Sequence, residues 1–473
     1  MHSPITSPPG PGRRRFLTSS LAALGEFACG TLPAADQPNF VLIYCDDLGY
    51  GDLGCFGSTK HRTPNVDRMA SEGMRFTSFY VTSGVCTPSR SSLMTGCYPR
   101  RVNMHVDASG RGVLFPVAKK GLHPDEITVA EVLRDQGYTT GCIGKWHLGD
   151  QPRFLPTRQG FGSYFGIPYS NDMHEHKNGQ PDWPPLPLMR NETVVEAPAD
   201  QITLTRRYTE EAVRFIEGNQ SHPFFLYLPH AMPHNPVNAS NRFRGKSANA
   251  GYGDAVEEID WSTGVILNTL DRLGLSGNTL VLFTSDNGAS GIWGGSNLPL
   301  SGWKGSTMEG GMSVPCVMRM PGRIPAGTVC NELTSTLDVM PTFAHLAGGE
   351  VPSGRIVDGR NFWPLASGKA GAKPAHEVFF YYHRDTLQAV RSGKWKLHLP
   401  GGKRELRLFD VEADIAESKN VAARNPGIVK RLSALAEQAR ADLGDGGHAG
   451  AHQRPAGMVV TPRPLLLSRG GAS

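Results

Sequence analysis

Three continuous apolar runs, each stopping abruptly at polar residues, constrain the fold of this chain more than any other feature. They cover residues 39–45, 223–228 and 279–284. Runs of this length that are apolar throughout are typical of strands buried on both faces of a mostly parallel sheet. Ligands of such sheets bind beyond the carboxyl ends of the strands. The sequence therefore predicts an α/β protein whose functional residues directly follow these runs.

Helical patterns alternate with the apolar runs. The stretch 63–73 has a threonine cap, a proline in the first turn and a terminal glycine, and 252–273 places apolar residues at helical spacing. Further helices are expected at 127–136 and 336–347. Further strands are expected at 74–79, 138–143 and 315–320. This alternation favours an α/β sandwich with a mostly parallel central sheet.

Composition suggests four parts along the chain. We expect an export signal at 1–35, the main α/β domain at 36–370, a small C-terminal subdomain with an antiparallel sheet and a helix at 371–445, and a mobile tail at 446–473. The second boundary falls in a stretch rich in Gly, Ala and Lys. Residues 160–199 show little periodicity, which predicts a long surface insertion that rims the site.

The first 35 residues have the pattern of an export leader. Three consecutive arginines, Arg13 to Arg15, precede a modestly apolar run, and small residues at 32–35 offer a cleavage site. This resembles a bacterial twin-arginine leader, so we expect a periplasmic or extracellular protein. The run is too short to span a bilayer, so no membrane span is expected. Lipidation at Cys29 is the alternative, although the residues before it match poorly.

Charge and cysteine usage exclude two classes of protein. The net charge of +5 falls to +3 without the leader, and no arginine-rich stripe follows, so no nucleic-acid partner is expected. The eight cysteines have spacings that fit no zinc module. Outside the leader and Cys86 six remain, an even number that is compatible with disulfides. If export follows folding in a reducing compartment, most of them stay as free buried thiols.

Two adjacent carboxylates, Asp46 and Asp47, end the first apolar run. Such a pair is unfavourable at the end of a central strand unless it is paired with cations or bound to a metal. The alternative is a surface turn with two solvated aspartates. The position at a strand end favours metal ligation.

The stretch from Cys86 to Gly96 reads as a turn followed by a short helix. Thr87 and Pro88 suit the first turn, Gly96 can end the helix in a left-handed conformation, and Cys86 would lie just before the helix. Unpaired N–H groups there favour negative charge, and Arg90 one turn later adds a permanent cation. These properties predict an anion site or an activated thiol; the alternative is a buried structural cysteine.

Other polar residues follow predicted strands. Lys145 and His147 are two apart, so on an extended segment they would point the same way and suit a dianionic ester, unless they are solvated. Two histidines, His230 and His234, follow the run 223–228 and could equally cap the core. Within the predicted insertion, four polar residues are expected to be solvated rather than metal ligands: Asn171, Asp172, His174 and His176.

The string Cys86-x-Pro-Ser-Arg90 followed by Leu-Met-Thr-Gly96 resembles the signature of the type I sulfatases. Gly144-Lys-Trp-His-Leu-Gly149, Ser285-Asp-Asn-Gly288 and Gly302-Trp-Lys-Gly305 are similar to further motifs of that family, in the family's order. Residues 251–256 and 294–297 look closest to its arylsulfatase A and N-acetylgalactosamine-6-sulfatase branch. The resemblance covers residues 37–443 and implies the alkaline-phosphatase-like α/β fold.

The resemblance also implies the catalytic residues. Cys86 would be oxidised by a formylglycine-generating enzyme to Cα-formylglycine, whose hydrated aldehyde attacks sulfur and then expels sulfate through its second hydroxyl. The implied roles of the other residues are as follows: Arg90 orients formylglycine, Lys145 and Lys304 bind sulfate, His147 assists elimination, His234 protonates the leaving oxygen, and Asp286 accepts the gem-diol proton. His234 matches the family better than His230.

A metal site follows from the same resemblance. Its implied ligands are Asp46, Asp47, Asp286, Asn287 and formylglycine-86. An oxygen-only set favours Ca²⁺, with Mg²⁺ second. The expected function is hydrolysis of a sulfate ester on a small molecule or glycan, and we expect the ester to be carried by a sugar. The rivals are a phosphomonoester or phosphonate hydrolase of the same fold and a non-catalytic binder of sulfated glycans.

Overall fold

The computed structural model describes the chain except for residues 2–36, 176–182 and 468–473. The predicted export signal, Cys29 and His176 therefore lie outside the described residues. Within the described part, no helix is both long and apolar enough to cross a membrane. Seven cysteines fall there, and all are unpaired thiols.

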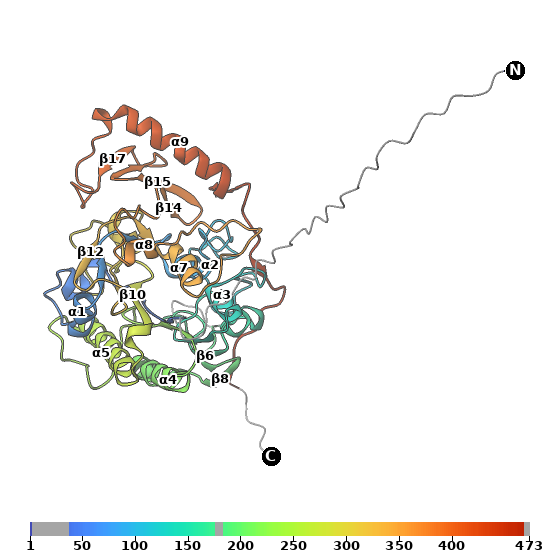
Figure 1. Cartoon of the computed structure of the whole chain (residues 1–473), viewed down its shortest axis with the longest axis vertical. Helices are drawn as coiled ribbons and strands as arrows, with labels where there is room; N and C mark the ends of the chain where they lie inside the picture. Colours follow the sequence, from blue (N-terminus) through green and yellow to red (C-terminus); the bar gives the residue numbers. More distant parts are fainter. Residues whose placement is uncertain (2–36, 176–182, 468–473) are drawn as a thin grey trace, which may run out of the picture. The chain divides into compact units, whose positions relative to one another are not determined.

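A ten-stranded mixed sheet forms the centre of the main unit, as the alternation of strands and helices predicts (Figure 1). Its inner strands β10, β1, β9, β5 and β6 run parallel, while β11, β7 and β8 pair antiparallel. In spatial order the strands are β12 (Thr328–Cys330), β2 (Met74–Phe76), β11 (Cys316–Arg319), β10 (Thr279–Ser285), β1 (Asn39–Cys45), β9 (Phe224–Pro229), β5 (Thr139–Ile143), β6 (Ser163–Gly166), β7 (Leu188–Arg190) and β8 (Thr193–Glu196).

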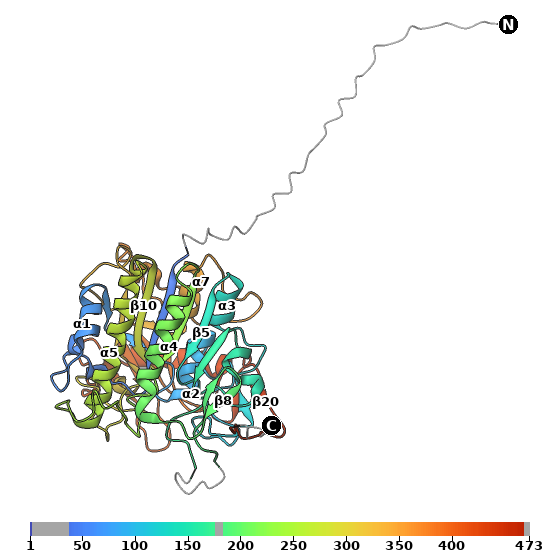
Figure 2. The ribbon, with the colours of Figure 1, turned by 90° about the horizontal axis from the view of Figure 1, so that it is seen from below.

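Helices cover both faces of this sheet, so side chains of the central strand are buried on either side. In β1, Phe40, Leu42 and Tyr44 enter one apolar core, and the alternating residues enter the other. The first core is closed by α2 (Cys86–Thr95), α3 (Val129–Asp135) and α7 (Val339–Leu346); the second is closed by α1 (Pro64–Ser71), α4 (Leu204–Gly218) and α5 (Ala250–Arg272). Figure 1 shows the two helical layers with the sheet between them, and Figure 2 views the molecule from the side of α4 and α5.

A second, four-stranded antiparallel sheet follows in the C-terminal region, as expected. It contains β14 (Phe379–His383), β15 (Thr386–Ser392), β16 (Trp395–His398) and β17 (Arg407–Asp410), and α9 (Pro426–Leu443) packs against β15. Lys396 of this sheet donates to Glu309 and Glu417 over 2.8 and 3.0 Å, and all three side chains are buried. Glu417 also accepts the backbone N–H of Glu309. This buried polar cluster joins the C-terminal sheet to the segment that follows Lys304. The domain boundary near residue 370 stays a prediction.

Two stretches differ from the expectations. Residues 160–199 are not merely a surface insertion, because they supply β6, β7 and β8 to the edge of the main sheet. The predicted mobile tail covers 446–473. In the part of it that the structure describes, 446–467, β20 (Gly457–Met458) pairs with β4 (Lys120–Gly121). Arg454 nearby donates to both carboxylate oxygens of Glu126 over 2.7 and 2.9 Å. These backbone and ion-pair contacts hold the stretch on the main unit.

Candidate active site

The register of the parallel strands gathers the predicted acidic residues at one edge of the sheet. Cys45 of β1 pairs with Ser285 of β10, so Asp46 and Asp286 emerge side by side. The backbone N–H of Asp286 donates to Cys45 over 3.0 Å, and the N–H of Asp47 donates to Asp286 Oδ1 over 3.1 Å. Asp47 has φ 67°, a left-handed conformation that is sparsely populated outside glycine and is concentrated at functional sites.

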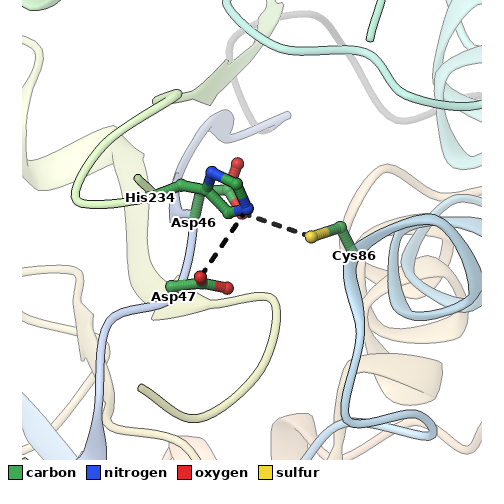
Figure 3. A group of neighbouring side chains, drawn as sticks. All are labelled: Asp46, Asp47, Cys86 and His234. Atoms are coloured by element: carbon green, nitrogen blue, oxygen red, sulfur yellow. Dashed lines mark hydrogen bonds and ion pairs between the residues drawn. The ribbon is translucent and has the colours of Figure 1, made fainter. Parts of the chain in front are cut away.

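Helix α2 brings Cys86 to the same place (Figure 3), and Arg90 follows one turn later in the same helix. Cys86 is the first helical residue, rather than the residue before the helix, because Val85 provides the extended cap; Gly96 ends the helix at φ 64° as predicted. The thiol donates to Asp46 Oδ1 over 3.4 Å. Arg90 is fully buried, and its Nη2 and Nε donate to Asp286 Oδ2 over 2.8 and 3.1 Å.

The segment after β5 places Lys145 and His147 in the site, although not on an extended backbone. Lys145 Nζ donates to Asp46 and, over 3.1 Å, to Ser170. His147 has φ 63°, and its Nε2 donates to the backbone carbonyl of Leu114 over 2.9 Å. Within the described residues, the buried Nδ1 of His147 has no hydrogen-bond partner. The neutral ring therefore keeps one nitrogen available as an acceptor.

The loop after β9 contributes His234 and not His230. His234 Nε2 lies 3.8 Å from Asp47 Oδ2, and its Nδ1 donates to Asn171 Oδ1 over 3.1 Å. His230 is fully buried, and neither ring nitrogen has a partner among the described residues. Lys304 completes the group by donating to Asp47 Oδ1 over 2.7 Å.

Two residues of the site were missed by sequence reasoning. Ser170 accepts from Lys145, and Asn171, which we expected to be solvated, is fully buried against His234. Both come from the loop after β6, where no motif or periodicity marks them. This loop follows a strand of the main sheet, and loops at the carboxyl ends of parallel strands carry ligand sites. That position is the signal that could have indicated the two residues.

Burial and charge shift the acidities of these groups in different directions. Burial raises the pKa of Asp46, but Lys145 and His234 outweigh it and hold the pKa well below its ordinary value. Burial and the Asp46 carboxylate raise the pKa of Asp286 to about 7. Burial and Asp46 also raise the pKa of the Cys86 thiol well above its ordinary value. The thiol is therefore protonated near neutral pH and poorly suited to act as a nucleophile.

The donor atoms fit a hard divalent cation. Ligand atoms of Asp46, Asp47, Cys86 and His234 lie within 4.8 Å of one another. Asn287 Oδ1 is buried and accepts no hydrogen bond from the described residues, while its amide donates to Asp47 over 2.7 Å. A buried oxygen without a donor is unfavourable unless a cation or water meets it. Carboxylate and amide oxygens at one point are typical of Ca²⁺ or Mg²⁺ sites.

A cavity of 510 Å³ opens onto this group. Its wall includes catalytic candidates and residues from distant loops: Ser83, Gly84, Val85, Cys86, Arg111, Gly112, Val113, Phe115, His147, Ser170, Asp172, Met173, His234, Lys304, Gly305, Tyr382, His383 and Arg384. The volume is typical of a small-molecule site. Cys86, His147, His234 and Lys304 connect this cavity to the buried carboxylates and cations behind it. Such an arrangement suits catalysis on an anionic ester.

Comparisons with known proteins identify the family. The Sulfatase family model matches residues 38–349, and the C-terminal model of N-sulphoglucosamine sulphohydrolase matches residues 303–441. The chain belongs to the sulfatase family and is a sulfatase enzyme, as the motifs predicted.

Individual relatives agree with this assignment. N-acetylgalactosamine-6-sulfatase of Mus musculus is 40% identical over 417 residues, or 85% of this chain and 79% of that protein. Arylsulfatase A of Bos taurus is 42% identical over 391 residues, or 78% of this chain and 76% of that protein. The crystal structure of Ps i-CgsB in complex with k-i-k-neocarrahexaose is 31% identical, with a TM-score of 0.75 over 85% of this chain and 92% of that one.

Proposed function

We propose that this enzyme hydrolyses sulfate esters of carbohydrates through formylglycine at position 86 and a bound Ca²⁺, with Mg²⁺ as the second choice. The observation that carries the proposal is the position of Cys86: the side chain meets the cavity beside Asp46, yet its own thiol is held protonated. Oxidation to a hydrated aldehyde would supply an oxygen nucleophile where the thiol supplies none. A formylglycine-generating enzyme is the partner that this requires.

The surrounding side chains suit binding and proton transfer. Lys145 and Lys304, each paired with a carboxylate, are assigned to bind the sulfate oxygens, and Arg90 is assigned to orient residue 86. His234 lies at the cavity wall with its Nε2 3.8 Å from Asp47, and it is assigned to protonate the leaving oxygen. The Nδ1 of His147 has no hydrogen-bond partner among the described residues, and it is assigned to accept a proton during release of sulfate.

Asp286 is assigned to take the proton of the attacking hydroxyl. Asp46, Asp47, Asp286, Asn287 and residue 86 would hold the metal ion. When bound, the ion polarises the sulfate oxygens and stabilises developing negative charge.

The carbohydrate substrate rests on the relatives. N-acetylgalactosamine-6-sulfatases share 39–40% of their residues with this chain, and the neighbour Ps i-CgsB was solved with a neocarrahexaose. Export, which we infer from the leader, would bring the enzyme to glycans outside the cell. A phosphonate monoester hydrolase of Agrobacterium radiobacter is a structural neighbour at 20% identity and a TM-score of 0.61, a likeness of fold alone.

The test is sulfate release by protein produced together with a formylglycine-generating enzyme. Peptide mass first establishes that sulfur at Cys86 is replaced by oxygen with loss of two hydrogens. The panel holds N-acetylgalactosamine 6-sulfate, its 4-sulfate, glucosamine 6-sulfate, an aryl sulfate and the matched aryl phosphate. We expect release from a sugar sulfate, and none from a folded Cys86→Ala variant. Phosphate release exceeding sulfate release, or full turnover by Cys86→Ala, would reject the proposal.

A further inference from the structure

Two arginines line the cavity outside the residues assigned to sulfate and metal. Arg111 and Arg384 lie on its wall together with Lys304, and Asp172 is the one carboxylate among the described residues that line it. The wall therefore carries more positive than negative side chains. The positive charge of Arg111 and Arg384 is additional to that of Lys145 and Lys304, which are assigned to bind the sulfate ester.

Arg111 is held in place before any ligand arrives. Its Nε donates to Asp107 over 2.7 Å, and its guanidinium lies 3.8 Å from the centre of the Phe115 ring, which in turn stacks on Trp183. Within the described part of the chain, its two Nη groups donate to no residue, and the side chain is 53% exposed. The Arg111 guanidinium is therefore held at Nε by Asp107 and on one face by Phe115, and its two Nη groups are free to bind an anion.

The loop that carries Arg111 is bonded to the catalytic group. The backbone N–H of Leu114 donates to the Thr87 hydroxyl over 3.2 Å, and the carbonyl of Leu114 accepts from His147 over 2.9 Å. Thr87 is the neighbour of Cys86 in helix α2. Arg111 thus has a defined position relative to the reacting centre.

Arg384 approaches the same region from the C-terminal sheet. It occupies the tight turn between β14 and β15 with φ 54°, where glycine or asparagine is the usual residue. Its side chain runs along Gly112, because a Cβ at Gly112 would lie 3.6 Å from Arg384 Nε. Among the described residues it has no ion-pair partner. The preceding His383 donates from Nδ1 to the carbonyl of Gly305 over 2.7 Å, which ties this turn to the Lys304 loop.

We propose that Arg111 and Arg384 together bind a second anionic group of the substrate, either a uronate carboxylate or a second sulfate. The inference rests on the proposed function and narrows it: the preferred substrate is a polyanionic glycan rather than a singly charged sulfate ester. Arginine forks bind both anions through paired N–H groups. The buried Oδ1 of Asp172, which has no partner in the described residues, would accept a hydroxyl of the same glycan.

The test compares Arg111→Gln and Arg384→Gln with wild type, all with Cys86 converted. The substrates share one sulfated sugar: the monosulfated monosaccharide, the same sugar joined to a uronate, and the same sugar with a second sulfate. The measured quantity is the ratio of kcat/KM between a doubly charged and the singly charged substrate. We expect each variant to lower this ratio about 10-fold or more, since a charge-assisted hydrogen bond is lost. The two doubly charged substrates distinguish carboxylate from sulfate.

Arg134→Gln, which removes an exposed arginine of α3, is the matched control, and Arg384→Lys should recover part of the ratio. An unchanged ratio in both glutamine variants would overturn the inference while leaving the sulfatase activity established. If converted wild type releases no sulfate from any substrate, the proposed function fails. In that case the dissociation constants of the same glycans for the unconverted protein decide the inference, with the same expected ratio and the same refuting result.

Discussion

Replacing Lys396 with methionine should destabilise the protein strongly, because its ammonium group pairs with two buried carboxylates at once. The Lys396 Nζ lies 2.8 Å from Glu309 Oε1 and 3.0 Å from Glu417 Oε1, and it also sits 4.1 Å from the centre of the Tyr381 ring. The other cationic side chains near them are His398, 2.7 Å from Glu417, and Arg391, 3.8 Å from Glu309. Methionine fills a similar volume but leaves both carboxylates without the ammonium group. Removing one partner of a buried ion pair typically lowers the free energy of unfolding by about 3–5 kcal/mol.

The free energy of unfolding would be measured by urea titration with tryptophan fluorescence. Lys394→Met is the control, because Lys394 lies two residues away, pairs with Asp410 over 2.7 Å and is 45% exposed. An exposed ion pair of this kind contributes little to the free energy of unfolding. Equal destabilisation by the two variants would refute the reasoning, since it would mean that the buried cluster is not held by the Lys396 charge.

The effect should also depend on pH. Burial raises the pKa of Glu417, but Lys396 and His398 outweigh it and lower the pKa from 4.5 to about 2. A folded-state pKa below the unfolded value contributes stability above the unfolded pKa, and that contribution is lost as pH falls through the folded pKa. The difference between wild type and Lys396→Met should therefore be largest above about pH 5 and shrink toward pH 2. A difference that grows on acidification would contradict this assignment.

Two further predictions concern the candidate site. His234→Leu should lower kcat about 100-fold or more, as expected for a lost general acid. His230→Leu should keep turnover, because burial lowers the pKa of His230 to about 3 and the neutral ring has no partner among the described residues. Steady-state kinetics of both variants would test this, and the larger loss of kcat in His230→Leu would assign the general acid to His230. Ca²⁺ at 100 times its dissociation constant should raise the free energy of unfolding by about 2.7 kcal/mol, a shift that Asp47→Ala removes; a shift that survives in Asp47→Ala would place the ion elsewhere.

The sequence predicted the central part of the site because its residues directly follow buried strands. Asp46 and Asp286 follow two long apolar runs. When these runs pair as parallel strands, the two aspartates lie next to each other. The edge of the sheet was not predictable in this way. Strands β6, β7 and β8 have only four, three and four residues, too few for an alternating pattern to be visible.

The cavity wall was missed for a different reason. Arg111 and Arg384 lie far apart in the sequence, and each is brought to the cavity by a turn whose position depends on packing between the two sheets. Glu309 likewise follows a glycine-rich loop, and only the fold brings Lys396 to it. Local patterns carry no information about such pairs.

The burial of helix α2 bears on whether Cys86 can be modified before or after the chain folds. All ten of its residues are buried, and Cys86 is only 3% exposed at the base of the cavity. If Cys86 is converted as proposed, its modifying enzyme needs access to the cysteine and its neighbours, which the packed helix does not give. We therefore expect the oxidation to take place on the nascent or unfolded chain. A route that exports the chain already folded would then require the modifying enzyme to act in the compartment of synthesis, before export.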